Sequence, residues 1–226
     1  MTIVSLALSI VACFAVSEDG DIVKNVAWAT GELSNVVNKN VSDAEVPLEV
    51  TLHIGLSAVV QESKFDDSAD TSQTIKWDDV DTCGADYCQD CKDTATGTAS
   101  TAIIACVTKF PAGGLMVKRR VPRTDCYFFK FMSMVSTFMG LITLVSSLLS
   151  FSDDCWTSFP DSIEIVVGDN MILSGDASYS AGPGFLCLLA AVFFDCFVAL
   201  VHILTPVPKD EQDSGNTVVQ VKHVGA

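Results

Sequence analysis

Long apolar stretches divide the chain into candidate membrane spans and polar loops. The clearest stretch runs from Tyr127 to Phe151, where Lys130 is the only charged residue. A second stretch runs from Pro183 to Thr205 and is followed by Pro206 and Pro208, which commonly come after a finished helix. Both exceed the roughly 20 apolar residues that a helix needs to cross a bilayer. The pattern therefore predicts spans over 127–151 and 183–205.

Two further stretches have a weaker span pattern. Residues 95–117 contain Lys109, Pro111 and a pair of glycines, which membrane helices tolerate when neighbouring helices satisfy the backbone. Residues 1–16 are apolar, but at about 1.5 Å per residue they reach only about 24 Å, short of a hydrocarbon core of roughly 30 Å. No Lys or Arg precedes this run, as a secretory signal would require. We expect a short first span here, open to extension by preceding residues.

The charges separate on the two sides of these four spans. Residues 17–94 hold 17 acidic residues and five lysines, and residues 152–182 hold six acidic residues and no basic one. The connection 118–126 is basic instead, with Lys118, Arg119, Arg120 and Arg123. Short basic loops stay in the cytoplasm. This predicts a multi-pass protein of the plasma membrane or an endomembrane, with loop 118–126 and tail 206–226 inside and both acidic loops outside or luminal.

The formal net charge of −15 is concentrated on the outer side, which would carry 23 of the 28 carboxylates. Such a surface repels nucleic acid and attracts cations or basic partners, so nucleic-acid binding is excluded. The sequon Asn40-Val41-Ser42 also falls on this side and is a candidate glycosylation site. We expect the partners to be the lipid bilayer and other membrane proteins, among them copies of this chain.

The cysteines divide according to the same topology. Four lie within the expected spans and one at their inner edge: Cys13, Cys106, Cys187, Cys196 and Cys126. The remaining four lie in the outer loops: Cys83, Cys88, Cys91 and Cys155. Disulfides persist in that compartment, and four cysteines allow three connectivities, which stay open at this point.

The outer loops have strand patterns. Val46 to Val60 alternates apolar and polar residues, and Thr74 to Val80 offers a second short strand. Ser162 to Leu173 is typical of a hairpin, with its turn at Gly168 to Asn170. An isolated hairpin is only marginally stable. The expected fold is therefore a four-helix transmembrane bundle with a small antiparallel sheet built from both outer loops.

This arrangement resembles the claudin-like tetraspan superfamily. The resemblance is carried by the strand from Leu48 to Val60, by Trp77 ahead of Cys83 and Cys91, and by the basic residues 118–120. It implies that a disulfide between Cys83 and Cys91 pins the sheet. The sequence departs from the family in lacking a GLW tripeptide before the first cysteine, in the spacing of Trp77, and in residues 17–45, which look like an insertion.

Charged residues inside the spans are the clearest functional signal. Lys109 and Asp195 fall at similar depth, and each shares a helix face with small residues that allow helices to approach closely. An ionisable residue in a membrane is costly and is usually paired or functional. We expect an intramembrane ion pair with a structural role, and an ion or proton pathway is the alternative.

Two chemical alternatives concern the acidic segment before the second span. Cys88 and Cys91 form a CxxC motif of the kind found in membrane thiol oxidoreductases, but neighbouring aspartates disfavour the thiolate that such chemistry requires. A structural disulfide is therefore the favoured interpretation. Carboxylates for calcium are available from four residues, without the spacing of a calcium loop: Asp78, Asp79, Asp81 and Asp86. A solvated acidic surface is the default interpretation of this group.

The three histidines fall in a strand, a span end and the tail, so they do not converge on a metal. We expect no cofactor and no enzymatic activity. The sequence favours a protein that associates with others through its outer domain, as an adhesion, barrier or accessory subunit. An auxiliary or transport subunit that uses Lys109 and Asp195 is the alternative, and a thiol oxidoreductase is a further one.

Overall fold

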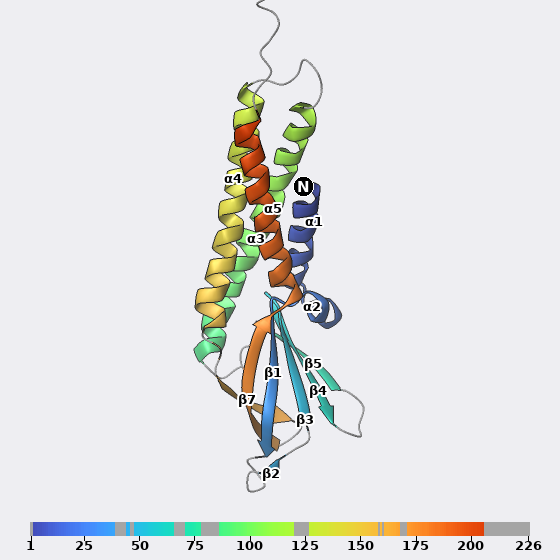
Figure 1. Ribbon diagram of the computed structural model, residues 1–226. Helices are drawn as coiled ribbons and strands as arrows, with labels where there is room; N and C mark the ends of the chain where they lie inside the picture. Colours follow the sequence, from blue (N-terminus) through green and yellow to red (C-terminus); the bar gives the residue numbers. More distant parts are fainter. Residues whose placement is uncertain are drawn as a thin grey trace, which may run out of the picture.

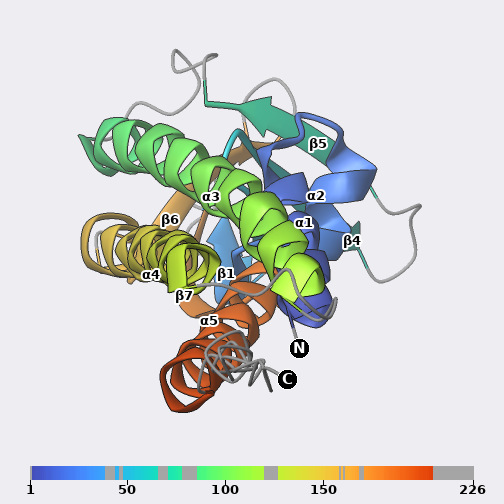
Figure 2. The ribbon, with the colours of Figure 1, turned by 90° about the horizontal axis from the view of Figure 1, so that it is seen from above.

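The computed structural model describes residues 2–38, 44–45, 48–65, 71–77, 86–119, 127–157, 159, 161–167 and 171–205. It consists of a helix bundle with a β-sheet at one end (Figure 1). Seen from above, the helices of the bundle lie together over one end of the sheet (Figure 2). Expectations that concern Asn40, Cys83, Cys126, Asp78, Asp79, Asp81 and the tail 206–226 lie outside the described residues.

Among the described helices, three are long and apolar enough to cross a membrane. They are α3 (Asp86–Arg119), α4 (Tyr127–Ser150) and α5 (Pro183–Leu204). The N-terminal α1 (Thr2–Cys13) continues as the 3-10 turn η1 (Phe14–Val16) and forms a shorter apolar helix. The structure thus shows a candidate integral membrane protein with three long spans.

Two spans extend beyond the ranges expected from the sequence. α3 begins at Asp86 instead of residue 95 and keeps Pro111 inside the helix. Its first turns are polar, so hydropathy does not mark where the helix begins. α4 ends at Ser150 and continues as a π-helical segment, η3 (Phe151–Trp156), which carries Cys155 toward α3.

The sheet is antiparallel and contains strands from both loops (Figure 1). The first loop supplies β1 (Ala29–Asn38), β2 (Ala44–Glu45), β3 (Leu48–Ile54), β4 (Ala58–Phe65) and β5 (Thr71–Lys76). The second supplies β6 (Ser162–Val167) and β7 (Met171–Ala181). The order is β5-β4-β3-β1-β7-β6, with β2 paired to β1. β1 therefore joins the loops, and the expected antiparallel sheet built from both loops is confirmed.

Three expectations about the first loop need correction. The single strand expected over Val46 to Val60 is two strands, because the chain turns after Ile54, where Gly55 N bonds to Ala58 O and Leu56 N bonds to Ala15 O. The second strand begins at Thr71 and ends at Lys76, instead of running from residue 74 to residue 80. No helix or strand was predicted within residues 17–45, which hold α2 (Gly20–Val26) and the central strand β1.

The main core lies where the bundle meets the sheet. It unites side chains of α1, α3, α4, α5 and the strand ends, including fully buried Trp28, Phe151 and Leu188. A smaller apolar cluster covers one face of the sheet, around Leu33, Val50 and Leu52. The main core therefore fixes the sheet against the bundle.

Candidate functional site

Lys109 and Asp195 meet in the interior of the bundle. Lys109 lies on α3 and Asp195 on α5, and the Nζ to Oδ2 distance is 2.9 Å. Their side chains are only 5% and 6% exposed. The close approach to Oδ2 is an ion pair outside hydrogen-bonding angles. The structure thus brings together the two charges that the sequence places at one depth.

Two serines of α1 complete this polar cluster. Lys109 Nζ donates to Ser5 Oγ and Ser9 Oγ, both at 2.6 Å. Ser5 Oγ in turn lies 2.6 Å from Asp195 Oδ1. Both serines are fully buried. α1, α3 and α5 are therefore connected through one set of charge-assisted contacts, which are stronger than hydrogen bonds between neutral groups.

Ser5 and Ser9 were not among the residues predicted from the sequence, although a signal for them was present. Ser5 and Ser9 are four residues apart in an apolar helix and so lie on one face. Other hydroxyls connect α4 to its neighbours. Ser147 Oγ lies 2.6 Å from Thr101 Oγ1 of α3, and Ser133 Oγ lies 3.2 Å from His202 Nε2 of α5. Polar contacts of this kind are typical of helix packing in membranes.

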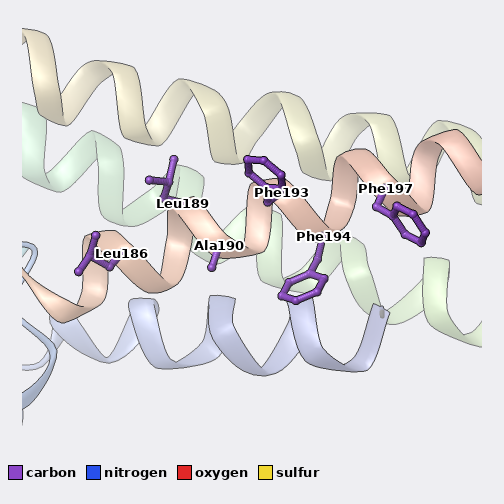
Figure 3. Close-up of a pocket in the computed structure, with 6 residues that line it drawn as sticks. All are labelled: Leu186, Leu189, Ala190, Phe193, Phe194 and Phe197. Atoms are coloured by element: carbon purple, nitrogen blue, oxygen red, sulfur yellow. The ribbon is translucent and has the colours of Figure 1, made fainter.

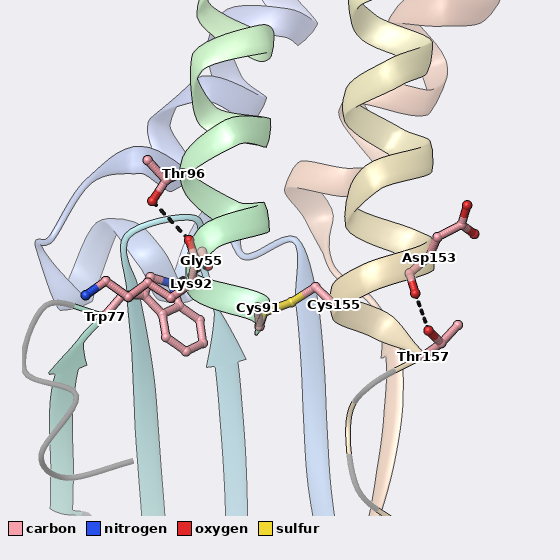
Figure 4. The surroundings of a disulfide bond; sticks show 8 residues. All are labelled: Gly55, Trp77, Cys91, Lys92, Thr96, Asp153, Cys155 and Thr157. Carbon is pink, nitrogen blue, oxygen red and sulfur yellow. Dashed lines mark hydrogen bonds between the residues drawn. A yellow bond between two sulfur atoms is a disulfide. The ribbon is translucent and has the colours of Figure 1, made fainter. Parts of the chain in front are cut away.

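Cys91 is paired differently from what the resemblance implied. Cys91, at the sheet end of α3, forms a disulfide with Cys155 of η3 (Figure 4). The pairing of Cys91 with Cys83 is therefore wrong. Both bonded residues are 0% exposed. Cys88 lies in the first turn of α3, where side chains are not described. The bond joins the sheet end of α3 to η3, which follows α4, between residues 64 positions apart in the sequence.

Trp28 fixes the first loop to the bundle. Its ring is fully buried and packs edge-on against Phe151, with centroids 5.1 Å apart. Its Nε1 donates to Ala12 O of α1 at 3.1 Å. Gly184 lies so close to this segment that a Cβ there would collide with Val26 O. Trp77, which was singled out from the sequence instead, lies near Gly55 (Figure 4), and its Nε1 donates to Gly55 O at 3.3 Å.

One face of the sheet is polar and lies opposite its apolar cluster. We define this polar face by Thr30, Glu32, Glu49, Thr51, Ser178 and Ser180. Glu32 sits at its centre, paired with Thr51 on β3 and Ser178 on β7. Glu32, Glu49, Ser178 and Ser180 are exposed. The polar face is thus a solvent-facing surface to which both loops contribute.

A charged group borders the polar face at β4. Lys24 of α2 lies 2.6 Å from Glu62 Oε1, and His53 Nε2 lies 3.3 Å from Glu62 Oε2. The bond from Lys24 lowers the pKa of Glu62, and the same bond raises the pKa of Lys24. Nearer the bundle, Lys76 pairs with Glu18. These contacts hold α2 against the sheet.

Metal and ligand sites receive little support from the described part of the chain. Within it, no group of three or more His, Cys, Asp or Glu side chains is placed to hold a metal ion. Asp86 begins α3, but its side chain is not described. An apolar hollow of about 500 Å³ lies along α5, lined by Leu186, Leu189, Ala190, Phe193, Phe194 and Phe197 (Figure 3). A shallow apolar helix surface of this kind suits acyl chains of the bilayer.

No family model matches the sequence, and no curated protein matches it.

Proposed function

We propose that this chain is a non-enzymatic, four-span membrane protein that associates with other proteins through the polar face of its outer sheet. The observation that carries the proposal is the pairing of β1 with β7, from Ala29 opposite Ala181 to Asn38 opposite Leu173. This pairing makes one continuous surface from two loops. The Trp28 contacts attach that surface to the bundle, and the disulfide joins α3 to η3 at the sheet end of the bundle. A partner would therefore meet a preorganised platform.

The role of α1 as a fourth span is supported by its contacts. Ser5 and Ser9 bond to Lys109, which pairs with Asp195 halfway along α5. α1 must therefore lie at the depth of the two charges. Exposed apolar residues such as Ile3 and Phe14 on its outer surface suit contact with lipid. We infer that α1 spans the membrane with the other helices, leaving both acidic loops outside or luminal.

The claudin-like architecture remains part of this proposal. Strands in the first loop, a hairpin in the second and a basic connection between the middle spans support it. The disulfide between Cys91 and Cys155 distinguishes this chain from the pairing that the resemblance implied. An adhesion, barrier or accessory role follows from this architecture, with lateral or trans contacts to other proteins or to further copies of the chain.

Charge reversal at the centre of the polar face tests the proposal. Partners are first captured by co-purification in detergent and mass spectrometry, and each is then titrated against vesicles that contain the protein. Glu32→Lys should weaken binding at least tenfold, about 1.4 kcal/mol. It reverses the charge of an exposed side chain at the centre of the polar face, between the strands of the two loops. Asp153→Lys is the matched control, since Asp153 is exposed in η3, away from the sheet. Equal binding by wild type and Glu32→Lys would contradict the proposal.

A transport or auxiliary role is the second candidate, and the buried polar cluster favours it. In that case Asp195→Asn should abolish ion or proton flux in reconstituted vesicles, while binding to the polar face persists. Thiol oxidoreductase activity has less support. Cys91 and Cys155 are bonded to each other and fully buried, so a soluble thiol substrate would not reach them.

A further inference from the structure

A second pair of cysteines lies inside the bundle, apart from the outer disulfide. Cys13 ends α1, and Cys106 lies in the middle of α3. Neither is bonded, yet their sulfur atoms are 3.1 Å apart. A disulfide bond measures about 2.05 Å, so the two atoms need to approach by only about 1 Å. They are 93 positions apart in the sequence, so the contact is not local along the chain.

The approach of these thiols is fixed by contacts on the same two helices. One turn from Cys13, Ser9 bonds to Lys109, which lies one turn from Cys106. At the far end of α1, Thr2 Oγ1 contacts the sulfur of Met116 at 3.0 Å. Buried alanines, Ala12 and Ala105 among them, allow the helices to pack closely beside the pair. The antiparallel register of α1 and α3 therefore sets the two sulfurs opposite each other.

Ser9 and Lys109 lie one turn from the pair, but the protein surface beside it is apolar. Cys106 is 8% exposed, and Cys13 is half-buried. Neighbouring residues on the same helices present large apolar side chains at the surface: Ile10, Phe14, Ile103, Val107 and Phe110. A reagent that reaches the thiols from this side must pass through the hydrocarbon region. Lipid-soluble molecules meet that requirement, whereas polar thiol reagents do not.

We propose that Cys13 and Cys106 form a disulfide-forming site that is oxidised by a lipid-soluble quinone. The two S–H bonds break and one S–S bond forms. The two electrons and two protons released reduce the quinone to its quinol. The product is a covalent bond between α1 and α3 beside the Lys109 and Asp195 pair, and a thiol reductant reverses it. This site is independent of the association proposed for the polar face.

Full-length protein in lipid vesicles tests this site directly. Vesicles are treated with decylubiquinone or with glutathione disulfide, remaining thiols are blocked with N-ethylmaleimide, and unreduced peptides are analysed by mass spectrometry. The quinone should produce a peptide in which Cys13 is joined to Cys106, at least ten times faster than glutathione disulfide. The Cys91 to Cys155 peptide should be unchanged, which shows that the fold is intact.

Substitutions give the matched comparison. Cys13→Ser or Cys106→Ser should remove the new peptide and the quinol, whereas the double change Cys187→Ser and Cys196→Ser on α5 should retain both. Fully alkylated Cys13 and Cys106 after quinone treatment of the wild type would overturn the proposal. Equal or faster reaction with glutathione disulfide would overturn the lipid-soluble route, and a mixed disulfide with glutathione would overturn the pairing.

Discussion

Lys109 of α3 and Asp195 of α5 form an ion pair inside the bundle, with Nζ 2.9 Å from Oδ2. The serines of α1 surround the same ammonium group. Removing two charges from water is costly. Their mutual attraction offsets that cost only when the geometry is good and further hydrogen bonds satisfy the remaining donors and acceptors. The cluster thus connects three helices and makes α1 part of the bundle.

A double-mutant cycle tests this interpretation. Asp195→Asn and Lys109→Met should each lower the free energy of unfolding in membranes by about 3 to 5 kcal/mol, because each leaves one buried charge unpaired. The double variant should recover much of the loss, since it removes both desolvation penalties. Stability is measured by thermal unfolding in lipid nanodiscs. Additive losses would contradict a structural pair.

Loss of the disulfide between Cys91 and Cys155 should destabilise the sheet end of the protein. Cys91→Ala, Cys155→Ala and the double variant should each lower its free energy of unfolding by about 2 to 5 kcal/mol. All three losses should be similar, since each removes the same bond. Chemical denaturation followed by tryptophan fluorescence measures the change, with Cys187→Ala on α5 as the control. An unaltered denaturation midpoint in the double variant would contradict a structural role for the bond.

Trp28 provides a test of the contact between the sheet and the bundle. Trp28→Ala should cost about 3 to 5 kcal/mol because it empties a fully buried site among aromatic rings. Trp28→Phe should cost less, since it keeps an aromatic ring and loses only part of the volume and the bond to Ala12 O. The order of thermal midpoints should be wild type, Trp28→Phe, Trp28→Ala. Equal midpoints for both variants would argue against aromatic packing as the source of the stability that Trp28 contributes.

The contact between Lys24 and Glu62 predicts a small dependence on pH. Because the folded state lowers the pKa of Glu62 below its ordinary value of 4.5, the carboxylate contributes stability above that value, and this is lost as the pH falls through the folded pKa. The pair is partly exposed, so the effect should be about 0.2 to 1 kcal/mol. Glu62→Gln should remove it in denaturation curves between about pH 3 and 7. If Glu62→Gln left the pH dependence of stability unchanged, the contact between Lys24 and Glu62 would not be its source.

Hydropathy, charge and helical spacing predicted the long helices, the two-loop sheet and the depth of Lys109 and Asp195. They could not predict which cysteine joins Cys155, because that depends on where the polar first turns of α3 lie. The break between β3 and β4 was also missed, since the alternation of apolar residues continues across Gly55. Ser5 and Ser9 contact Lys109 only because α3 packs against α1. The two serines alone did not predict this contact, since serine in an apolar helix can have other partners.

The central claim is that four spans place both loops on one side of the membrane, where they build one sheet. Glycosylation mapping tests it most directly. Engineered acceptor sites at Asp161 in the second loop and at Pro122 in the basic connection are compared with the natural site at Asn40. The account predicts glycan at Asn40 and Asp161 and none at Pro122. Modification at Pro122, or at only one of the two loops, would contradict it.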